Sequence, residues 1–244
     1  MTATSSKATS VIGWAAIVAL AISLLFGLVL SPPEVNMGDS VRLLYLHLPT
    51  IAVSYLGYGI TFIGSVIYLR NQSTFWDLLA GAAAEIGVLF TAFVLITGAI
   101  WGKPTWGTYW EWDPRLTATT VMFIMYLGYL AIRRMELPQE VRSRRAAVIG
   151  IIAIFNLIIV RYSVQWWRGL HQGQTLGIDT QLDGLMLFSL FLGVVAFLLL
   201  GAWLLIHRFR LAWLERQVED MRLARAITER RGESGGTKLG GALS

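Results

Sequence analysis

The sequence predicts an all-α polytopic membrane protein with six transmembrane helices. Of the 244 residues, 55% are hydrophobic and only 14% are charged, whereas about 25% of the residues in a typical soluble domain are charged. The mean hydropathy of the chain is +0.60. Six long apolar runs follow one another, and polar segments separate them. About 20 helical residues cross a hydrocarbon core about 30 Å thick, so runs of this kind predict membrane spans.

The first two runs lie in residues 11–30 and 43–69. Residues 1–10 are small and polar, and we expect them to be disordered. The first run is too long for the apolar part of a signal peptide, and a Ser-Pro-Pro sequence ends it because proline cannot continue a helix. We therefore expect a retained span. The second run is longer than a span needs, so its first part, with His47, is expected to project beyond the membrane.

The other four spans are predicted in residues 78–100, 118–132, 146–160 and 185–206. The fourth run is short, so Leu116 and Thr117 are expected to be helical as well. An even number of spans places both termini on one side of the membrane. Fifteen of the 20 lysines and arginines lie on that side and five lie on the other. Because cytoplasmic loops carry the excess of positive charge, both termini are predicted to be cytoplasmic.

The charged tail after the sixth span divides into two parts. Residues 207–231 have apolar side chains at positions 211, 214, 218 and 221, a spacing that predicts a cytoplasmic amphipathic helix. Such a helix either lies on anionic lipid headgroups or contacts a cytoplasmic partner. Residues 232–244 are rich in Gly and Ser and are expected to be a disordered tail.

Composition also excludes several kinds of site. The chain has no cysteine, which excludes thiolate metal sites, disulfides and thioether attachment of a cofactor to this chain. The net charge is +5 and the pI is about 9.7. The predicted topology explains this basic balance, so it does not indicate a nucleic-acid partner.

The most unusual stretch is WGKPTWGTYWEWDPRLT, residues 101–117, which contains four tryptophans. Its two glycines and Pro104 argue against a long helix at this point. Indole rings suit a membrane boundary because each has an apolar body and a polar N–H group. The stretch is therefore either an aromatic belt that anchors two helices or a platform for a ligand.

Two of the three histidines lie on the same outward side as this stretch. His47 precedes it and His171 follows it, whereas His207 lies at the cytoplasmic end of span six and is read as a boundary residue. Haem needs apolar surface, one or two neutral imidazoles on iron, and cations near its propionates. The tryptophans offer the apolar surface, and the two histidines offer the imidazoles. The candidate cations are Arg42, Lys103 and Arg115.

Spacing adds modest support for a shared site. Trp167 and His171 are four residues apart, and so are Trp106 and Trp110. Residues four apart share one face of a helix. Trp167 is therefore a further candidate for contact with the ligand.

These residues resemble the tryptophan-rich "WWD" signature of haem-handling membrane proteins, and within them the cytochrome c maturation protein C (CcmC, haem exporter protein C) family. The resemblance includes YLHLP around His47 and YSVQWWRGLHQG from Tyr162 to Gly173. It covers roughly residues 42–206, and residues 11–206 are expected to form a six-helix transmembrane haem-handling domain. The family's axial histidines match His47 and His171. The signature residues match Trp101, Trp106, Trp110, Trp112 and Asp113, and the propionate contacts match Arg42 and Arg115.

The resemblance implies a function as well as a site. Proteins of this family hold haem b on the periplasmic face of the bacterial inner membrane and deliver it to the haem chaperone CcmE. They work beside the small protein CcmD and the ABC-type pair CcmA and CcmB. The implied role is haem delivery without turnover chemistry, with at most a lyase-like step that attaches haem to the chaperone.

Two other functions are weighed against haem delivery. A b-type electron-transfer cytochrome would place histidine pairs on facing helices inside the bilayer, and here both candidates lie outside it. A transporter with an aromatic gate would need polar groups near the membrane midplane, where only Glu85 and Asn156 are candidates. Glu85 has no evident cationic partner in a neighbouring span, so a polar packing role is expected for it.

Overall fold

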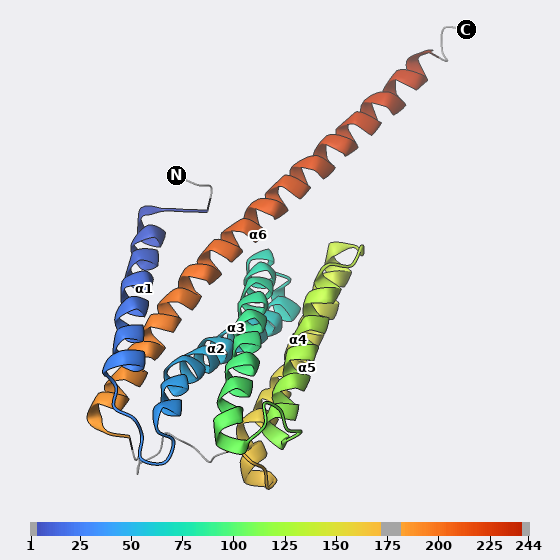
Figure 1. The fold of residues 1–244 in the computed structure, drawn as a ribbon. Helices are drawn as coiled ribbons and strands as arrows, with labels where there is room; N and C mark the ends of the chain where they lie inside the picture. The colour runs from blue at the N-terminus through green and yellow to red at the C-terminus, as the bar shows by residue number, and fades with distance from the viewer. Residues whose placement is uncertain (1–3, 172–181, 241–244) are drawn as a thin grey trace.

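The computed structural model describes residues 4–171 and 182–240, the last ten of them through the backbone alone. Over those ranges the chain forms six long helices and no strand (Figure 1). Each helix is long and apolar enough to cross a membrane, which confirms the predicted fold class. The helices are α1 (Lys7–Leu25), α2 (Leu44–Asn71), α3 (Thr74–Trp106), α4 (Pro114–Arg133), α5 (Gln139–Trp166) and α6 (Gly184–Gly240). A π-helical turn, Phe26–Leu30, extends α1, and a short 3-10 helix, Asp39–Leu43, leads into α2.

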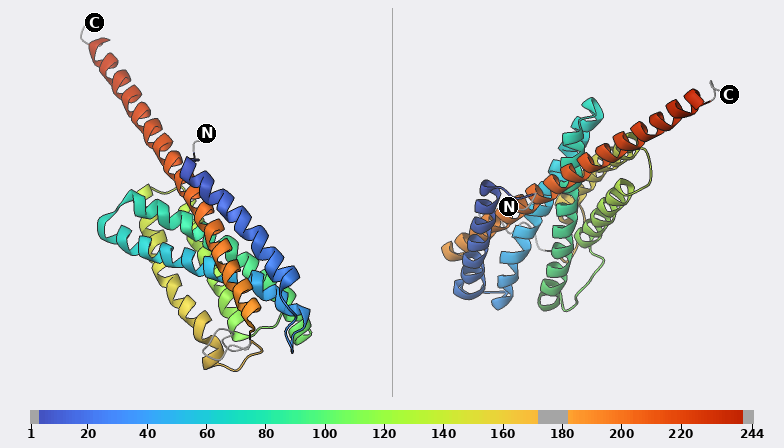
Figure 2. Two further views of the ribbon diagram at one scale, coloured as in Figure 1. Left: turned by 90° about the vertical axis from the view of Figure 1, so that its left-hand side faces the viewer. Right: turned by 90° about the horizontal axis from the view of Figure 1, so that it is seen from above.

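The helices pack as neighbouring pairs, α1 with α6, α2 with α3, and α4 with α5 (Figures 1 and 2). Small residues allow the close approach. A Cβ atom on Gly57 of α2 would lie 2.9 Å from the carbonyl oxygen of Ala83 in α3. A Cβ atom on Gly193 of α6 would lie 3.1 Å from the carbonyl oxygen of Tyr45 in α2. Membrane helices associate through such tight packing, because lipid is as apolar as their side chains.

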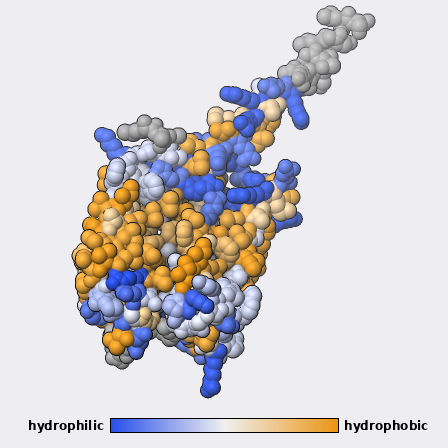
Figure 3. Space-filling view, in the orientation of Figure 1, coloured by the Kyte–Doolittle hydropathy of each residue, from blue (hydrophilic) through white to orange (hydrophobic). Residues whose placement is uncertain are grey.

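Both ends of the described chain lie at one end of the bundle, and the connection from α3 to α4 lies at the other (Figure 1). Apolar residues form a band across the middle of the face seen in Figure 3, and hydrophilic residues lie toward both ends. This distribution is that of a protein immersed in lipid. The side of the membrane that each end faces is still a prediction from the distribution of lysine and arginine.

The structure differs from the sequence-based expectation at the tryptophan-rich stretch. α3 continues through Trp101 and ends only at Trp106, although Pro104 lies inside it. The proline is tolerated because it falls in the last turn, where it removes a single hydrogen bond. The helix then ends at Gly107, which has φ +83° and donates its N–H to the carbonyl of Lys103 at 3.0 Å. A left-handed glycine is a common end for a helix.

Helices α1, α5 and α6 also extend beyond their predicted limits. α5 covers Gln139–Trp166, because its polar ends have enough helix propensity to continue outside the apolar run. α6 is unbroken through residue 207, where a separate helix was predicted, and runs to Gly240, where a disordered tail was expected. Residues 241–244 of that predicted tail lie outside the described residues. α1 begins at Lys7, because the Ser6 hydroxyl caps it by accepting the N–H of Thr9. Of the predicted disordered start, residues 1–3 lie outside the described residues.

The expectation that Glu85 has no cationic partner is wrong. Arg208 of α6 donates from Nη2 to Glu85 Oε1 at 2.9 Å, and its Nε contacts the other carboxylate oxygen. The sequence did not show this pair because Arg208 lies beyond the predicted end of span six. Only the continuation of α6 as a straight helix brings it beside α3. The bidentate pair satisfies a carboxylate that would be costly in lipid.

Candidate functional site

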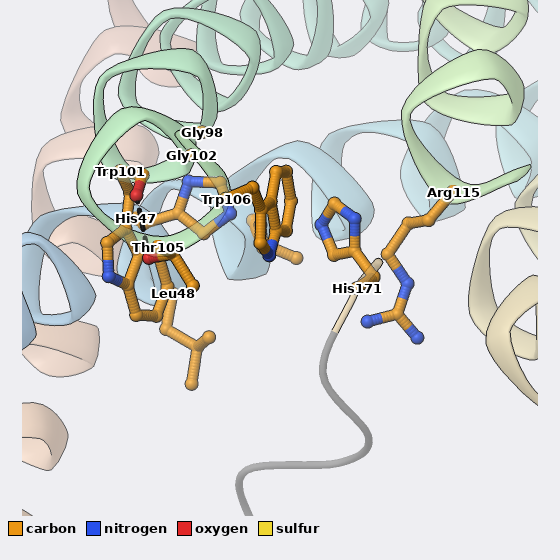
Figure 4. A pocket seen from close by; sticks show the side chains of 10 residues that line it. His47, Leu48, Gly98, Trp101, Gly102, Thr105, Trp106, Arg115 and His171 are labelled. Atoms are coloured by element: carbon orange, nitrogen blue, oxygen red, sulfur yellow. Dashed lines mark hydrogen bonds between the residues drawn. The ribbon is translucent and has the colours of Figure 1, made fainter. Parts of the chain in front are cut away.

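A cavity of about 100 Å³ lies at the end of the bundle opposite the termini. It is bounded by the first turns of α2, the last turns of α3, the start of α4 and the segment after α5. Figure 4 shows its lining side chains. The lining residues are His47, Leu48, Ile51, Gly98, Trp101, Gly102, Thr105, Trp106, Arg115 and His171. The two histidines that sequence reasoning selected therefore share one pocket, although 124 positions separate them in the chain.

His47 is buried in the first turns of α2, and its ring is fixed by α3. The Thr97 hydroxyl lies 2.8 Å from His47 Nδ1 and donates its own proton to the carbonyl of Phe93 at 2.7 Å. In the tautomer with its proton on Nδ1, His47 donates to this hydroxyl, both contacts are satisfied, and Nε2 is the ring atom with a free lone pair. Gly98 makes room for the ring, because a Cβ atom there would lie 3.2 Å from His47 Cε1.

His171 is fixed in an analogous way by Asp113. The Asp113 carboxylate caps α4, where Oδ1 accepts the backbone N–H groups of Arg115 at 2.9 Å and Leu116 at 3.0 Å. The same oxygen lies 3.1 Å from His171 Nδ1, and Oδ2 accepts the His171 backbone N–H at 3.3 Å. Gly169 is required here, because a Cβ atom on it would lie 2.3 Å from Asp113 Oδ2.

The protonation states follow from this arrangement. Burial alone would raise the pKa of Asp113, but the N–H groups it accepts and the nearby His171 hold that pKa below its usual value. The carboxylate is therefore ionised at neutral pH and can only accept. Burial lowers the pKa of His171 below its usual value, against the opposing effect of Asp113. His171 is thus a neutral imidazole with its proton on Nδ1 and a free lone pair on Nε2.

Two tryptophans and one arginine complete the pocket. Figure 4 shows Trp106 between the two imidazoles, and its ring centroid lies 4.8 Å from that of His171. The Trp101 ring meets His47 edge-on at 5.8 Å. Arg115, from the first turn of α4, lines the cavity and has no ion pair among the described side chains. The pocket thus combines apolar ring surface with one uncompensated cation.

Other predicted site residues do not line this cavity. Trp110 and Trp112 contact each other edge-to-face at 5.5 Å, and Trp112 is 74% exposed. Trp167 is 52% exposed and stacks edge-on against Trp166. The predictions of shared helix faces for Trp106 with Trp110 and for Trp167 with His171 are wrong. α3 ends at Trp106 and α5 ends at Trp166, so in neither pair do both residues lie on the same helix.

Two of the three candidate cations are engaged elsewhere. Arg42 donates to Asp39 Oδ1 at 3.0 Å and to the carbonyl of Leu28. Lys103 donates to the carbonyl of Gly107 at 2.8 Å and lies over the Tyr109 ring. Only Arg115 is left to provide a positive charge inside the pocket.

Sequence reasoning missed the residues that hold the ligating groups in place. Thr97 and Gly98 lie in the apolar run of α3, where neither residue type is unusual. One signal was available: Thr97 and Trp101 are four residues apart on a helix and therefore share a face. Gly169 gave no comparable signal, since its role depends on contact with a distant carboxylate.

The lining is not that of a site for a bare metal ion. Among the described residues, no group of three or more His, Asp or Glu side chains is placed to hold a metal. Two imidazoles over indole rings instead suit a flat macrocycle that brings its own four equatorial ligands.

The family profile and the similar proteins that match this chain carry the same description. The family profile described as "Heme exporter protein C" matches residues 1–224. The chain is 36% identical over 218 residues to "Heme exporter protein C" of Haemophilus influenzae, covering 87% of each chain. It is also 36% identical to the proteins of that name from Bradyrhizobium diazoefficiens, over 87% of this chain and 81% of the other, and Escherichia coli, over 80% of each. The chain therefore belongs to the heme exporter protein C family.

Proposed function

We propose that this protein binds haem b between His47 and His171 at the periplasmic face of the inner membrane and delivers it for cytochrome c maturation. The observation that carries this proposal is that the two imidazoles are oriented in the same way. Each lines one pocket, and each has Nδ1 tied to a neighbour, so that Nε2 is available. Ligating histidines are commonly oriented in this way by a hydrogen bond from the other nitrogen.

The side chains that line the pocket suit haem chemically, but the Trp106 ring must move before haem can lie between the two imidazoles. Trp101, Leu48 and Ile51 offer apolar surface, and Arg115 offers a charge-assisted partner for a propionate. A macrocycle between both imidazoles would take the space that the Trp106 ring fills in Figure 4. Trp106 is the last residue of α3 and precedes the left-handed Gly107. Helix ends open more readily than helix interiors, so we expect this ring to move against the face of the ligand.

The remaining parts of the proposal follow from the family. Haem would be passed to the chaperone CcmE, and CcmD, CcmA and CcmB would be partners in the inner membrane. The predicted topology supports the direction, since the pocket lies at the end of the bundle opposite the positively charged termini. In this role the protein is a delivery factor and not an enzyme with a turnover reaction of its own.

Replacing Arg115 with leucine is expected to weaken haem binding about tenfold, because a propionate would lose a charge-assisted hydrogen bond. The test is a haem titration of purified protein followed in the Soret region. Arg168→Leu is the control, since Arg168 is an exposed cation near the same end that does not line the pocket. Equal affinity in the Arg115→Leu protein and the wild type would remove Arg115 from the proposed site.

Thr97→Val is expected to lower haem affinity by about tenfold, because it removes the acceptor that orients His47 while keeping the side-chain volume. Helix α3 should stay folded, since its backbone hydrogen bonds do not depend on this hydroxyl. Thr120→Val is the control, because Thr120 makes the same type of hydrogen bond to the carbonyl of Leu116 away from the pocket. If both variants titrate like the wild type, the argument from Nδ1 orientation fails for His47.

A further inference from the structure

A second cavity lies at the opposite end of the bundle from the histidines. It has a volume of about 400 Å³ and is lined by residues from α3, α4, α5 and the projecting part of α6. Figure 3 shows hydrophilic residues gathered between that part of α6 and the rest of the bundle, at the edge of the apolar band. The haem proposal makes no use of this cleft.

Ion pairs account for most of the charges in the cleft. Arg133 donates to Asp77 Oδ1 at 2.6 Å, and Ser143 donates to the other oxygen of the same carboxylate at 2.9 Å. Glu85 pairs with Arg208, as described above. Arg216 reaches out of the cleft to Asp220 at 3.1 Å. The Glu85–Arg208 pair joins α6 to α3, and the contacts of Asp77 join α4 and α5 to α3.

Two cations, one buried acceptor and one buried donor, Arg208 Nη1, are left without a hydrogen-bond partner among the described residues. Among the described side chains, Arg134 and Arg142 line the cleft without an ion pair or a side-chain hydrogen bond. Gln139 Oε1 is buried beside them and has no hydrogen-bond partner there. Gln139 is also the first residue of α5, and Pro138 before it offers no side-chain cap to the free N–H groups of that first turn. A buried acceptor without a partner is costly unless a ligand or water supplies a donor.

The opposite wall of the cleft has the complementary charge. Glu215 and Glu219 of α6 line it, and their side chains are 61% and 54% exposed. Their ion pairs are long, at 3.6 Å to Arg208 and 3.9 Å to Arg216. The cleft therefore places two available guanidinium groups on its α4–α5 wall and available carboxylates on its α6 wall.

We propose that this cleft binds a phospholipid headgroup. Its phosphodiester would lie against Arg134, Arg142 and the N-terminus of α5, where cations and free N–H groups favour an anion. Its donor-bearing substituent, an ethanolamine ammonium or a glycerol hydroxyl, would face Gln139 Oε1 and the two glutamates. The position at the edge of the apolar band favours a lipid over free phosphate, because the acyl chains would remain in the membrane. Such a lipid would brace α6 against α5.

The test uses the full-length protein in detergent, loaded with isotopically labelled phosphatidylethanolamine or phosphatidylglycerol and delipidated in steps under native mass spectrometry. The wild type is expected to retain one labelled lipid. The double variant R134Q/R142Q should retain about tenfold less, since each arginine near a phosphate contributes appreciably to lipid binding. The control is R144Q/R145Q, which removes the same charge from two exposed residues of α5 outside the cleft.

Equal loss of lipid in both double variants, or no loss in either, would overturn the proposal, because it would show only general attraction to a basic surface. Displacement of the lipid by millimolar inorganic phosphate would assign the site to free phosphate and overturn the lipid source. If R134Q/R142Q is not recovered folded, R134Q alone gives the same comparison, since the Arg134 side chain is exposed. Haem affinity should be unchanged in all of these variants, so this test is independent of the haem site.

Discussion

Replacing both His47 and His171 with alanine is expected to abolish haem binding, leaving less than about a tenth of the wild-type haem content after purification. The two imidazoles are the only candidate iron ligands lining the pocket in the described part of the chain. Indole stacking and Arg115 would still contact the macrocycle, but they do not bond to iron. The measurement is Soret absorbance per mole of protein, with size-exclusion chromatography to show that the bundle remains folded.

His207→Ala provides the control for that experiment. His207 lies at the other end of the bundle, where its ring contacts Trp203 at 4.9 Å and its Nδ1 lies 3.0 Å from the Thr4 hydroxyl. It should not affect haem content. A double variant of His47 and His171 with normal haem content would rule out the proposed site, and the same loss in His207→Ala would point to a general effect on the fold.

Asp113→Ala is expected to have the next largest effect, lowering haem affinity by about 10- to 100-fold. One carboxylate both accepts from His171 Nδ1 and caps α4, so its loss frees the ring and the start of the helix together. The loss of the cap should also lower the free energy of unfolding by about 1 kcal/mol. Haem titration and thermal denaturation of the same protein measure the two effects.

Two further variants separate the roles of Asp113. Asp183 makes an equivalent cap at the start of α6, where its Oδ1 accepts the N–H groups of Leu185 and Met186. Asp183→Ala should lower stability to a similar degree and leave haem affinity intact. Asp113→Asn keeps one acceptor oxygen and should bind haem better than Asp113→Ala. If Asp113→Ala and Asp183→Ala reduce haem affinity equally, Asp113 acts only through the stability of the fold.

The helices could be predicted because they depend on local composition. A long uncharged run must either enter a membrane or fail to fold, so the six spans follow from the sequence. Helix ends were less predictable. The run of polar residues at 139–145 continues a helix outside the lipid, and Pro104 is tolerated in a last turn. The spans were predicted from hydropathy, and hydropathy determines neither the start of α5 nor the end of α3.

The pocket could be predicted only in part, because its construction depends on contacts between distant residues. His47, His171, Trp101, Trp106 and Arg115 were selected from residue type and resemblance, and the fold brings them together. Thr97 and Gly169 act through contacts with distant residues; its spacing from Trp101 was the one local signal for Thr97, and Gly169 had none. Trp110, a residue of the signature, and Trp167 were also grouped with the pocket by helical spacing, and that spacing does not apply beyond the last helical residue.

The central claim is that two imidazoles from distant segments bind one iron. Electron paramagnetic resonance of the ferric haem complex tests it most directly, because two imidazoles give a low-spin signal. The wild type is expected to show that signal, and His47→Ala and His171→Ala should each shift it toward high spin. A wild-type spectrum retained by both single variants would contradict the claim.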